Sequence, residues 1–182
     1  DVGPANLLLN RLVQTVGLEM DVDGQRAASG KLIPELLESW QMLNYHAQAP
    51  PKSLGREWLE QEVWPHAERA LTSHWLNDVL ATAVAYASWA VARDIPVGSR
   101  VMVTGGGAFN PTLISALQRE TADSNVILHF PDDQLIHGKE ALVFAWLGLL
   151  RWLGQVNSLP SVTGSRVATS GGALWGKGPR AV

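Results

Sequence analysis

The chain has 182 residues, of which 46% are apolar and 17% are charged. This length suits one domain or two small ones, and the apolar content is typical of a folded protein. The formal net charge is −3 and no run rich in lysine and arginine occurs, so we expect no nucleic acid as a partner. Cysteine is absent, which excludes disulfides and thiolate chemistry and fits a reducing, cytoplasmic compartment. The longest apolar run, residues 79–92, is shorter than the ~20 residues that cross a bilayer, so we expect no membrane segment.

The first half of the chain has the apolar spacing of helices. This spacing predicts helices over residues 5–16 and 31–43, and a short one that ends at Ser29. Prolines and a glycine mark residues 47–56 as loop. Two further helices are expected, one over residues 58–70 that is broken near Pro65 and one from a capping Ser73 to about Arg93.

The pattern changes after Gly98. Residues 100–104 and 126–130 are short apolar runs that predict strands, and a helix from Asn110 through Glu120 lies between them. Strand, helix and strand in this order imply parallel pairing through a crossover connection, and hence an α/β unit. A second helix, over residues 139–153, is apolar almost all round, so we expect it to be deeply buried.

The turn after the first strand is the strongest local signal for a ligand. It reads Gly105-Gly106-Gly107-Ala108-Phe109-Asn110-Pro111, and main chain without Cβ atoms lets a ligand lie close to it. Ligands gather at the carboxyl ends of parallel strands, although a tight turn without a ligand is the alternative. The turn matches neither the dinucleotide fingerprint nor the phosphate loop that ends in Gly-Lys-Ser/Thr. We therefore expect it to pack against an adenine and a ribose.

Two carboxylates are candidates for proton transfer. Asp1, in Asp1-Val2-Gly3-Pro4-Ala5-Asn6, could act as a general base near a phosphate, or could cap a helix. Glu140 precedes ten uncharged residues, so we expect its carboxylate at the edge of a buried region, where proton transfer is favoured. The alternative is an acid in the first turn of a helix. The five histidines form no zinc motif, and we assign no metal ligands.

Six segments, taken in order, resemble the anhydro-N-acetylmuramic acid kinases of peptidoglycan recycling. They cover nearly the whole chain and are residues 1–6, 21–24 with Gly30, 51–57, 105–111, 139–145 and 159–164. The sequence departs from the family at Val2 and Ala5, where threonine and glycine are often found.

The resemblance implies an α/β fold, the actin/hexokinase-type (ribonuclease H-like) fold of sugar kinases, in which two lobes close on ATP. Residues 1–182 would form the C-terminal lobe, with a helix-rich insertion over about 2–95 and an α/β, nucleotide-facing part over about 96–182. The chain begins inside a motif, and the family's glycine-rich phosphate loop has no counterpart in it. We therefore expect the N-terminal lobe to belong to a longer protein, and this fragment alone to be inactive. A homodimer is also expected, with the tryptophan-containing helices between Val2 and Arg93 as its face.

The resemblance also implies a reaction and its residues. Water adds to the anomeric carbon of the anhydro amino sugar, and the freed 6-oxygen takes the γ-phosphoryl of ATP with the help of Mg²⁺. The family's positions match Asp1 and Glu140 as catalytic residues, and the nucleotide side falls on Gly3, Asn6, Gly105, Gly106, Gly107 and Asn110. The alternatives are another sugar kinase of this superfamily, a non-catalytic nucleotide-binding or dimerising lobe, and a Rossmann-like oxidoreductase.

Overall fold

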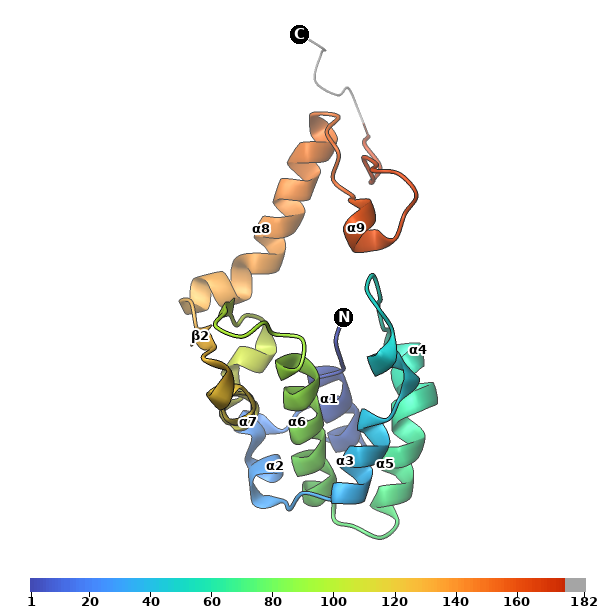
Figure 1. The fold of residues 1–182 in the computed structure, drawn as a ribbon, viewed down its shortest axis with the longest axis vertical. Helices are drawn as coiled ribbons and strands as arrows, with labels where there is room; N and C mark the ends of the chain where they lie inside the picture. Colours follow the sequence, from blue (N-terminus) through green and yellow to red (C-terminus); the bar gives the residue numbers. More distant parts are fainter. Residues whose placement is uncertain (176–182) are drawn as a thin grey trace.

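The computed structural model describes residues 1–175, which form a helix-rich mixed α/β structure (Figure 1). The helices and strands follow in the order α1 (Asn6–Val13), α2 (Gln25–Ser29), α3 (Pro34–Gln41), α4 (Arg56–Trp58), α5 (Trp64–Leu71), α6 (Leu76–Ala92), β1 (Arg100–Met102), α7 (Pro111–Thr121), β2 (Ile127–His129), α8 (Asp133–Trp152) and α9 (Pro160–Thr163). A single 3₁₀ turn, η5 (Gly106–Phe109), connects β1 with α7.

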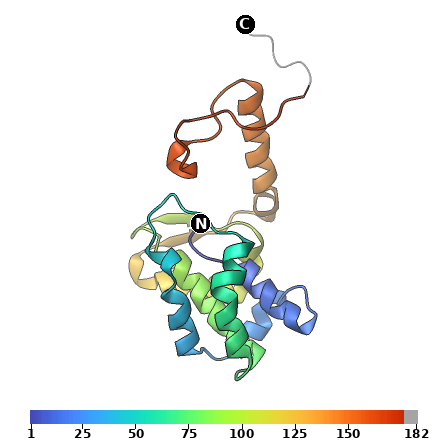
Figure 2. The same ribbon diagram turned by 90° about the vertical axis from the view of Figure 1, so that its right-hand side faces the viewer.

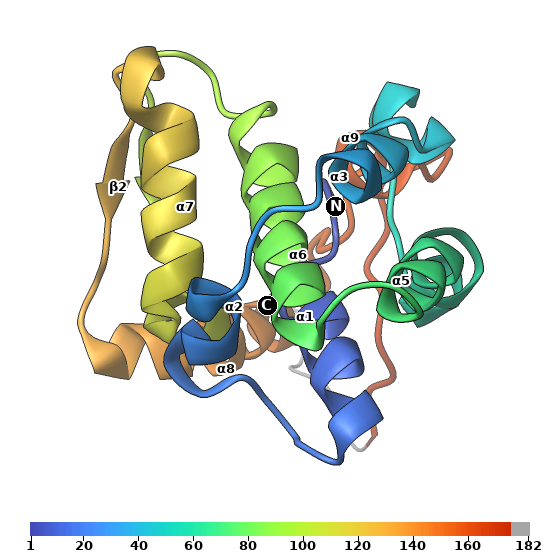
Figure 3. The ribbon, with the colours of Figure 1, turned by 90° about the horizontal axis from the view of Figure 1, so that it is seen from below.

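Helix α6 is the centre of the helical body. It contacts α1, α2, α3, α5 and α7, which lie around it when the molecule is seen from below (Figure 3). Most of its circumference is buried, and alanines let the neighbouring helices approach closely. Its buried hydroxyls are satisfied within the body. The Ser88 hydroxyl donates to the Val84 carbonyl at 2.9 Å, and the Thr82 hydroxyl accepts the Ile33 amide at 2.9 Å.

The sheet consists of two short parallel strands. Arg100 pairs with Ile127, Val101 with Leu128 and Met102 with His129. Helix α7 is the crossover between them and packs on α6. The predicted strand–helix–strand unit is therefore confirmed. Each strand is shorter than the apolar run that predicted it, since only three residues of each run are paired.

Helix α8 departs from the expected burial. It rises away from the helical body with α9 beside it, as the two side views show (Figures 1 and 2). Leu142 is 63% exposed, Phe144 65% and Trp146 58%, and Ile136 is the buried residue of this helix. The prediction of deep burial is wrong for residues 1–175, because the apolar face of α8 has no covering layer there. No helix in this part of the chain is both long and apolar enough to cross a membrane.

The start of α6 and the start of α5 also differ from the expectation based on the sequence. Helix α6 begins at Leu76 with Trp75 in the capping position, so the prediction that Ser73 caps it is wrong. The Ser73 hydroxyl instead reaches back to the Ala70 carbonyl at 3.5 Å, at the end of α5. The expected break near Pro65 is wrong, because α4, a π-helical turn over Leu59–Val63 and α5 follow one another without a gap, and Pro65 lies in the first turn of α5, where its missing N–H is tolerated.

The central place of α6 gives a stability prediction. Leu80 of α6 is fully buried, so Leu80→Ala removes packed methyl groups and leaves a cavity. We expect the free energy of unfolding in a denaturant titration to fall by about 2–5 kcal/mol. Leu32, which is 49% exposed, is the matched control: Leu32→Ala should lower the free energy of unfolding much less than Leu80→Ala does. Equal losses at the two positions would contradict the central role of α6.

Candidate nucleotide-binding and catalytic site

The glycine turn, residues Gly105 to Gly107, directly follows strand β1. Gly105 has φ +81° and ψ 175°, a combination that glycine adopts without a steric penalty. The Ala108 amide donates to the Gly105 carbonyl at 3.0 Å and closes the 3₁₀ turn. Asn110 then caps α7, because its side-chain oxygen accepts the Leu113 amide at 3.1 Å. The turn therefore ends a strand and opens a helix, as the sequence predicts, and Asn110 has a structural task in it.

The start of helix α1 lies against this turn. A Cβ atom on Gly106 would come within 3.3 Å of the Asn6 side-chain nitrogen, and one on Gly107 within 3.7 Å of its oxygen. Asn6 is thus brought together with the glycine turn, as expected. Gly3 has a different explanation, since a Cβ atom there would come within 2.7 Å of the Ala90 Cβ on α6. The absence of a side chain at Gly3 lets the chain pass close to α6, and this packing accounts for Gly3 without a ligand.

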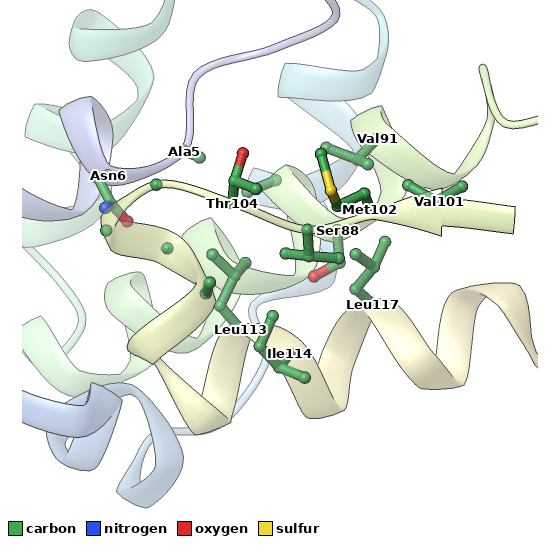
Figure 4. A pocket seen from close by; sticks show the side chains of 16 residues that line it. Ala5, Asn6, Ser88, Val91, Val101, Met102, Thr104, Leu113, Ile114 and Leu117 are labelled. Carbon is green, nitrogen blue, oxygen red and sulfur yellow. The ribbon is translucent and has the colours of Figure 1, made fainter. Parts of the chain in front are cut away.

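Two hollows flank the glycine turn. The first, here named the α8 pocket, has a volume of about 540 Å³ and is lined by Gly105, Gly106, Ile136, His137, Lys139, Glu140, Val143 and Phe144. The second, here named the apolar pocket, has a volume of about 390 Å³ and lies between β1, α6 and α7 (Figure 4). Its few polar side chains include Asn6, Ser88 and Thr104. The glycine turn contributes main chain to both hollows.

Glu140 shares the α8 pocket with the glycine turn, but its local setting differs from the prediction. Its side chain is exposed, so the expected partial burial is wrong. It is also not in the first turn of its helix, because α8 begins at Asp133 and Asp132 caps it by accepting the Leu135 amide at 2.8 Å. The sequence pattern predicts a start of this helix at Lys139, six residues after its observed start at Asp133.

Two further residues of the α8 pocket were missed from the sequence. Lys139 supplies a positive charge beside Glu140, and His137 stacks on Phe109 of the turn with ring centroids 4.9 Å apart. A signal for Lys139 was present, since it opens the segment 139–145 that resembles the kinase family. The stacking of His137 joins α8 to the glycine turn and has no local signature in the sequence.

Asp1 is held by residues distant in the sequence. Its Oδ2 accepts the Leu54 amide at 3.1 Å, its carbonyl accepts the Tyr45 hydroxyl at 2.7 Å, and its nitrogen donates to the Lys52 carbonyl at 2.9 Å. Ala5 is the residue in the capping position of α1, so the alternative of Asp1 as a helix cap is wrong. Asp1 is exposed and lines neither pocket described above.

Tyr45, which contacts Asp1, belongs to an aromatic cluster. The Tyr45 ring lies 5.0 Å from the Trp58 ring, and burial, with a contribution from the charge of Asp94, raises the pKa of Tyr45. Next to it, His46 Nε2 and the Tyr86 hydroxyl form a hydrogen bond of 2.7 Å. The cluster is therefore packed and hydrogen-bonded, and Tyr45 is its member that contacts Asp1.

The residues described fit a nucleotide better than they fit a metal ion. In the α8 pocket, main chain without Cβ atoms lies beside the cation of Lys139, and the amide of Asn6 lies on the other side of the same turn, towards the apolar pocket. Main chain and a cation together suit a phosphorylated, hydrogen-bonding ligand. Within residues 1–175 no group of three His, Cys, Asp or Glu side chains is arranged to hold a metal ion. These residues therefore form no metal site by themselves.

The chain is a mixed α/β structure with a parallel strand pair, a glycine turn at the carboxyl end of β1 and a carboxylate beside that turn, and the carboxyl ends of parallel strands are where such proteins commonly bind ligands. A family model described as "Anhydro-N-acetylmuramic acid kinase" matches residues 1–177. The chain belongs to the anhydro-N-acetylmuramic acid kinase family.

The similar proteins carry the same description. Proteins named anhydro-N-acetylmuramic acid kinase from Acidithiobacillus ferrooxidans and Chromobacterium violaceum are each 36% identical to this chain, over 91% and 96% of it. The one from Rhodococcus erythropolis is 35% identical over 96% of the chain. The matched regions cover 44%, 49% and 45% of these three relatives, so the chain spans about half the length of the curated relatives it matches.

The buried histidine gives a pH prediction. Burial, followed by the positive charges of Arg93 and Lys52, lowers the pKa of His46 from 6.5 to about 4. Between these two values the unfolded chain binds a proton that the folded chain does not bind. The contribution of His46 to stability is therefore complete above about pH 6.5 and is lost as the pH falls towards 4.

The measurement compares the chain with its His46→Asn variant in denaturant titrations from pH 7.5 to pH 4.5. The variant should be less stable at pH 7.5, because the hydrogen bond to Tyr86 is disturbed. The difference between the two proteins should narrow as the pH falls. A difference that stays constant over this range would contradict a depressed pKa of His46.

Proposed function

We propose that this chain is the C-terminal lobe of an ATP-dependent kinase that opens 1,6-anhydro-N-acetylmuramic acid with water and phosphorylates its 6-oxygen. The observation that carries the proposal is the meeting of the glycine turn with Glu140 in one pocket, in a chain of this family. The product would be N-acetylmuramic acid 6-phosphate. The reaction would belong to peptidoglycan recycling and take place in the cytoplasm.

Asp1 is assigned the proton transfer. In the proposed reaction the water oxygen bonds to the anomeric carbon, the bond from that carbon to the 6-oxygen breaks, and the water gives up a proton to the carboxylate of Asp1. The geometry supports this role because Leu54 fixes Oδ2 while the carboxylate stays exposed to a substrate. Glu140 is assigned as the second carboxylate of the site, facing the nucleotide pocket.

The glycine turn is assigned to ATP, which supplies the phosphoryl group when bound. Gly105, Gly106 and Gly107 would lie against the adenosine, with Asn6 beside them. Asn110 would act through the cap that holds the start of α7. Mg²⁺ assists such transfers and is usually held by the substrate phosphates with only one or two carboxylates, which agrees with the absence of a three-ligand group in residues 1–175.

The apolar face of α8 supports a second lobe as the partner. Leu142, Phe144 and Trp146 are exposed in residues 1–175, and burial of such side chains is favourable. The curated relatives are about twice as long as this chain, so we propose that their N-terminal half has a counterpart that covers this face. The homodimer stays a prediction, with the tryptophan-containing helices as its face. Trp40 and Trp58 pack into the core and would not form such a face, whereas Trp75 is 83% exposed.

Loss of the assigned base should stop the reaction. In the protein that carries both lobes, Asp1→Asn should lower kcat by about 10²–10⁴-fold, because a general base contributes about that much. ATP binding should be unchanged, since Asp1 does not line the α8 pocket. ADP release and sugar phosphate are measured together, with anhydro-N-acetylmuramic acid present or absent.

Asp123→Asn is the matched control, since Asp123 is an exposed carboxylate that lines neither the α8 pocket nor the apolar pocket. It should leave kcat unaffected. Near-normal turnover in Asp1→Asn would contradict the role of Asp1. A protein that binds ATP but never phosphorylates any amino sugar would favour the non-catalytic alternative.

The nucleotide assignment is tested at Gly106. A Cβ atom there meets the Asn6 side chain at 3.3 Å, so the methyl groups of valine would push the turn and Asn6 apart and disturb the main chain that lines both pockets. We expect Gly106→Val to weaken ATP binding by about 5- to 150-fold, from an overpacking cost of ~1–3 kcal/mol. Gly106→Ala should weaken it less. Calorimetric affinities that stay unchanged in both variants would rule out ATP at this turn.

A further inference from the structure

The position of Asp1 depends on a stretch of chain, residues 45–54, to which the assigned reaction gives no role. The main-chain nitrogen, the carbonyl and the Oδ2 atom of Asp1 each have a partner in the stretch from Tyr45 to Leu54: the carbonyl of Lys52, the hydroxyl of Tyr45 and the amide of Leu54, respectively. These partners follow Asp1 by 44, 51 and 53 residues, so only the folded chain brings them together.

We propose that Tyr45 is a positioning residue for the Asp1 carboxylate, acting with the main chain of residues 52–54. The inference rests on the proposed function, in which Asp1 takes the proton from water. The Tyr45 hydroxyl donates to the Asp1 carbonyl at 2.7 Å and fixes the backbone of Asp1, while the Leu54 amide at 3.1 Å fixes one carboxylate oxygen. Two fixed points on one residue determine the direction of its side chain.

Tyr45 is itself held firmly. It is 4% exposed, its ring lies 5.0 Å from that of Trp58, and the Lys52 ammonium lies 4.6 Å from the ring centroid. That ammonium also donates to the Tyr45 carbonyl at 3.1 Å, so one lysine ties the ring to the segment that contacts Asp1. The raised pKa of Tyr45 keeps its hydroxyl protonated, and hence able to donate, through the neutral pH range.

Loss of the Tyr45 hydroxyl can be tested without loss of the packing of its ring. Tyr45→Phe keeps the ring against Trp58 and Lys52, so the core should hold its packing. It removes only the donor to the Asp1 carbonyl, so the Leu54 amide alone holds the carboxylate, without a fixed backbone, and the direction of the carboxylate towards the water is less well defined. A misaligned base slows the chemical step without weakening the binding of either substrate. The expected signature is therefore a fall in kcat with KM unchanged.

The experiment compares Tyr45→Phe with Tyr86→Phe in the protein that carries both lobes. Both are buried tyrosines of one aromatic cluster, but the Tyr86 hydroxyl bonds to His46 and not to Asp1. Tyr45→Phe should lower kcat by about 2- to 13-fold, the range expected for one hydrogen bond, while KM for ATP and KM for the anhydro sugar should equal those of the wild type within experimental error. Tyr86→Phe should lower Tm and leave kcat unchanged.

A double variant keeps the two proposals apart. In the Asp1→Asn background, Tyr45→Phe should leave the residual rate unchanged, because the hydroxyl acts through a carboxylate that is already gone. The inference is overturned if kcat of Tyr45→Phe equals that of the wild type, if both tyrosine variants lose kcat in proportion to Tm, or if the double variant loses rate again. If instead Asp1→Asn retains full turnover, the proposed role of Asp1 fails first.

Discussion

The burial of helix α6 is the constraint on which the rest of the structure depends. Five helices pack around it, and its alanines together with two internally bonded hydroxyls make that close packing possible. Gly3 passes directly over Ala90, which sets the path of the chain from Asp1 to the start of α1. Helix α7 packs on α6 as well and carries the glycine turn at its N-terminal end. One buried helix therefore positions both the assigned base and the assigned nucleotide turn.

The candidate site is built from two kinds of support. The glycine turn is fixed locally, by the capping Asn110 and by the left-handed backbone of Gly105, so its geometry follows from a few adjacent residues. The Asp1 carboxylate is fixed by distant residues, through Tyr45 and Leu54. A turn that only has to offer main chain to a ligand can depend on local structure. A general base must point at the proton that it removes, so the orientation of its carboxylate has to be fixed more strictly, and contacts with residues distant in the sequence fix the orientation of Asp1.

The difference between local and distant support explains what the sequence could predict. The capped start of α7 and the parallel strands were predictable, because Asn110-Pro111 and the apolar runs act over a few residues. The resemblance gave the family and named Glu140, which the structure places beside the glycine turn. The contact of Tyr45 with Asp1 spans 44 residues and has no local pattern. The burial of α8 was predicted wrongly because an apolar helix indicates a tendency to be covered, and residues 1–175 contain no layer that covers it.

The most direct test of the account follows the oxygen atoms of the reaction. The protein that carries both lobes is given ATP and anhydro-N-acetylmuramic acid in ¹⁸O-water, and the sugar product is analysed by mass spectrometry after a rapid quench. Unlabelled product incubated in the same water corrects for exchange at the anomeric carbon. The account predicts one ¹⁸O at the anomeric carbon and none in the bond between the 6-oxygen and phosphorus, with one ADP formed per sugar phosphate. A sugar phosphate without the label, or ADP formed without sugar phosphate, would contradict it.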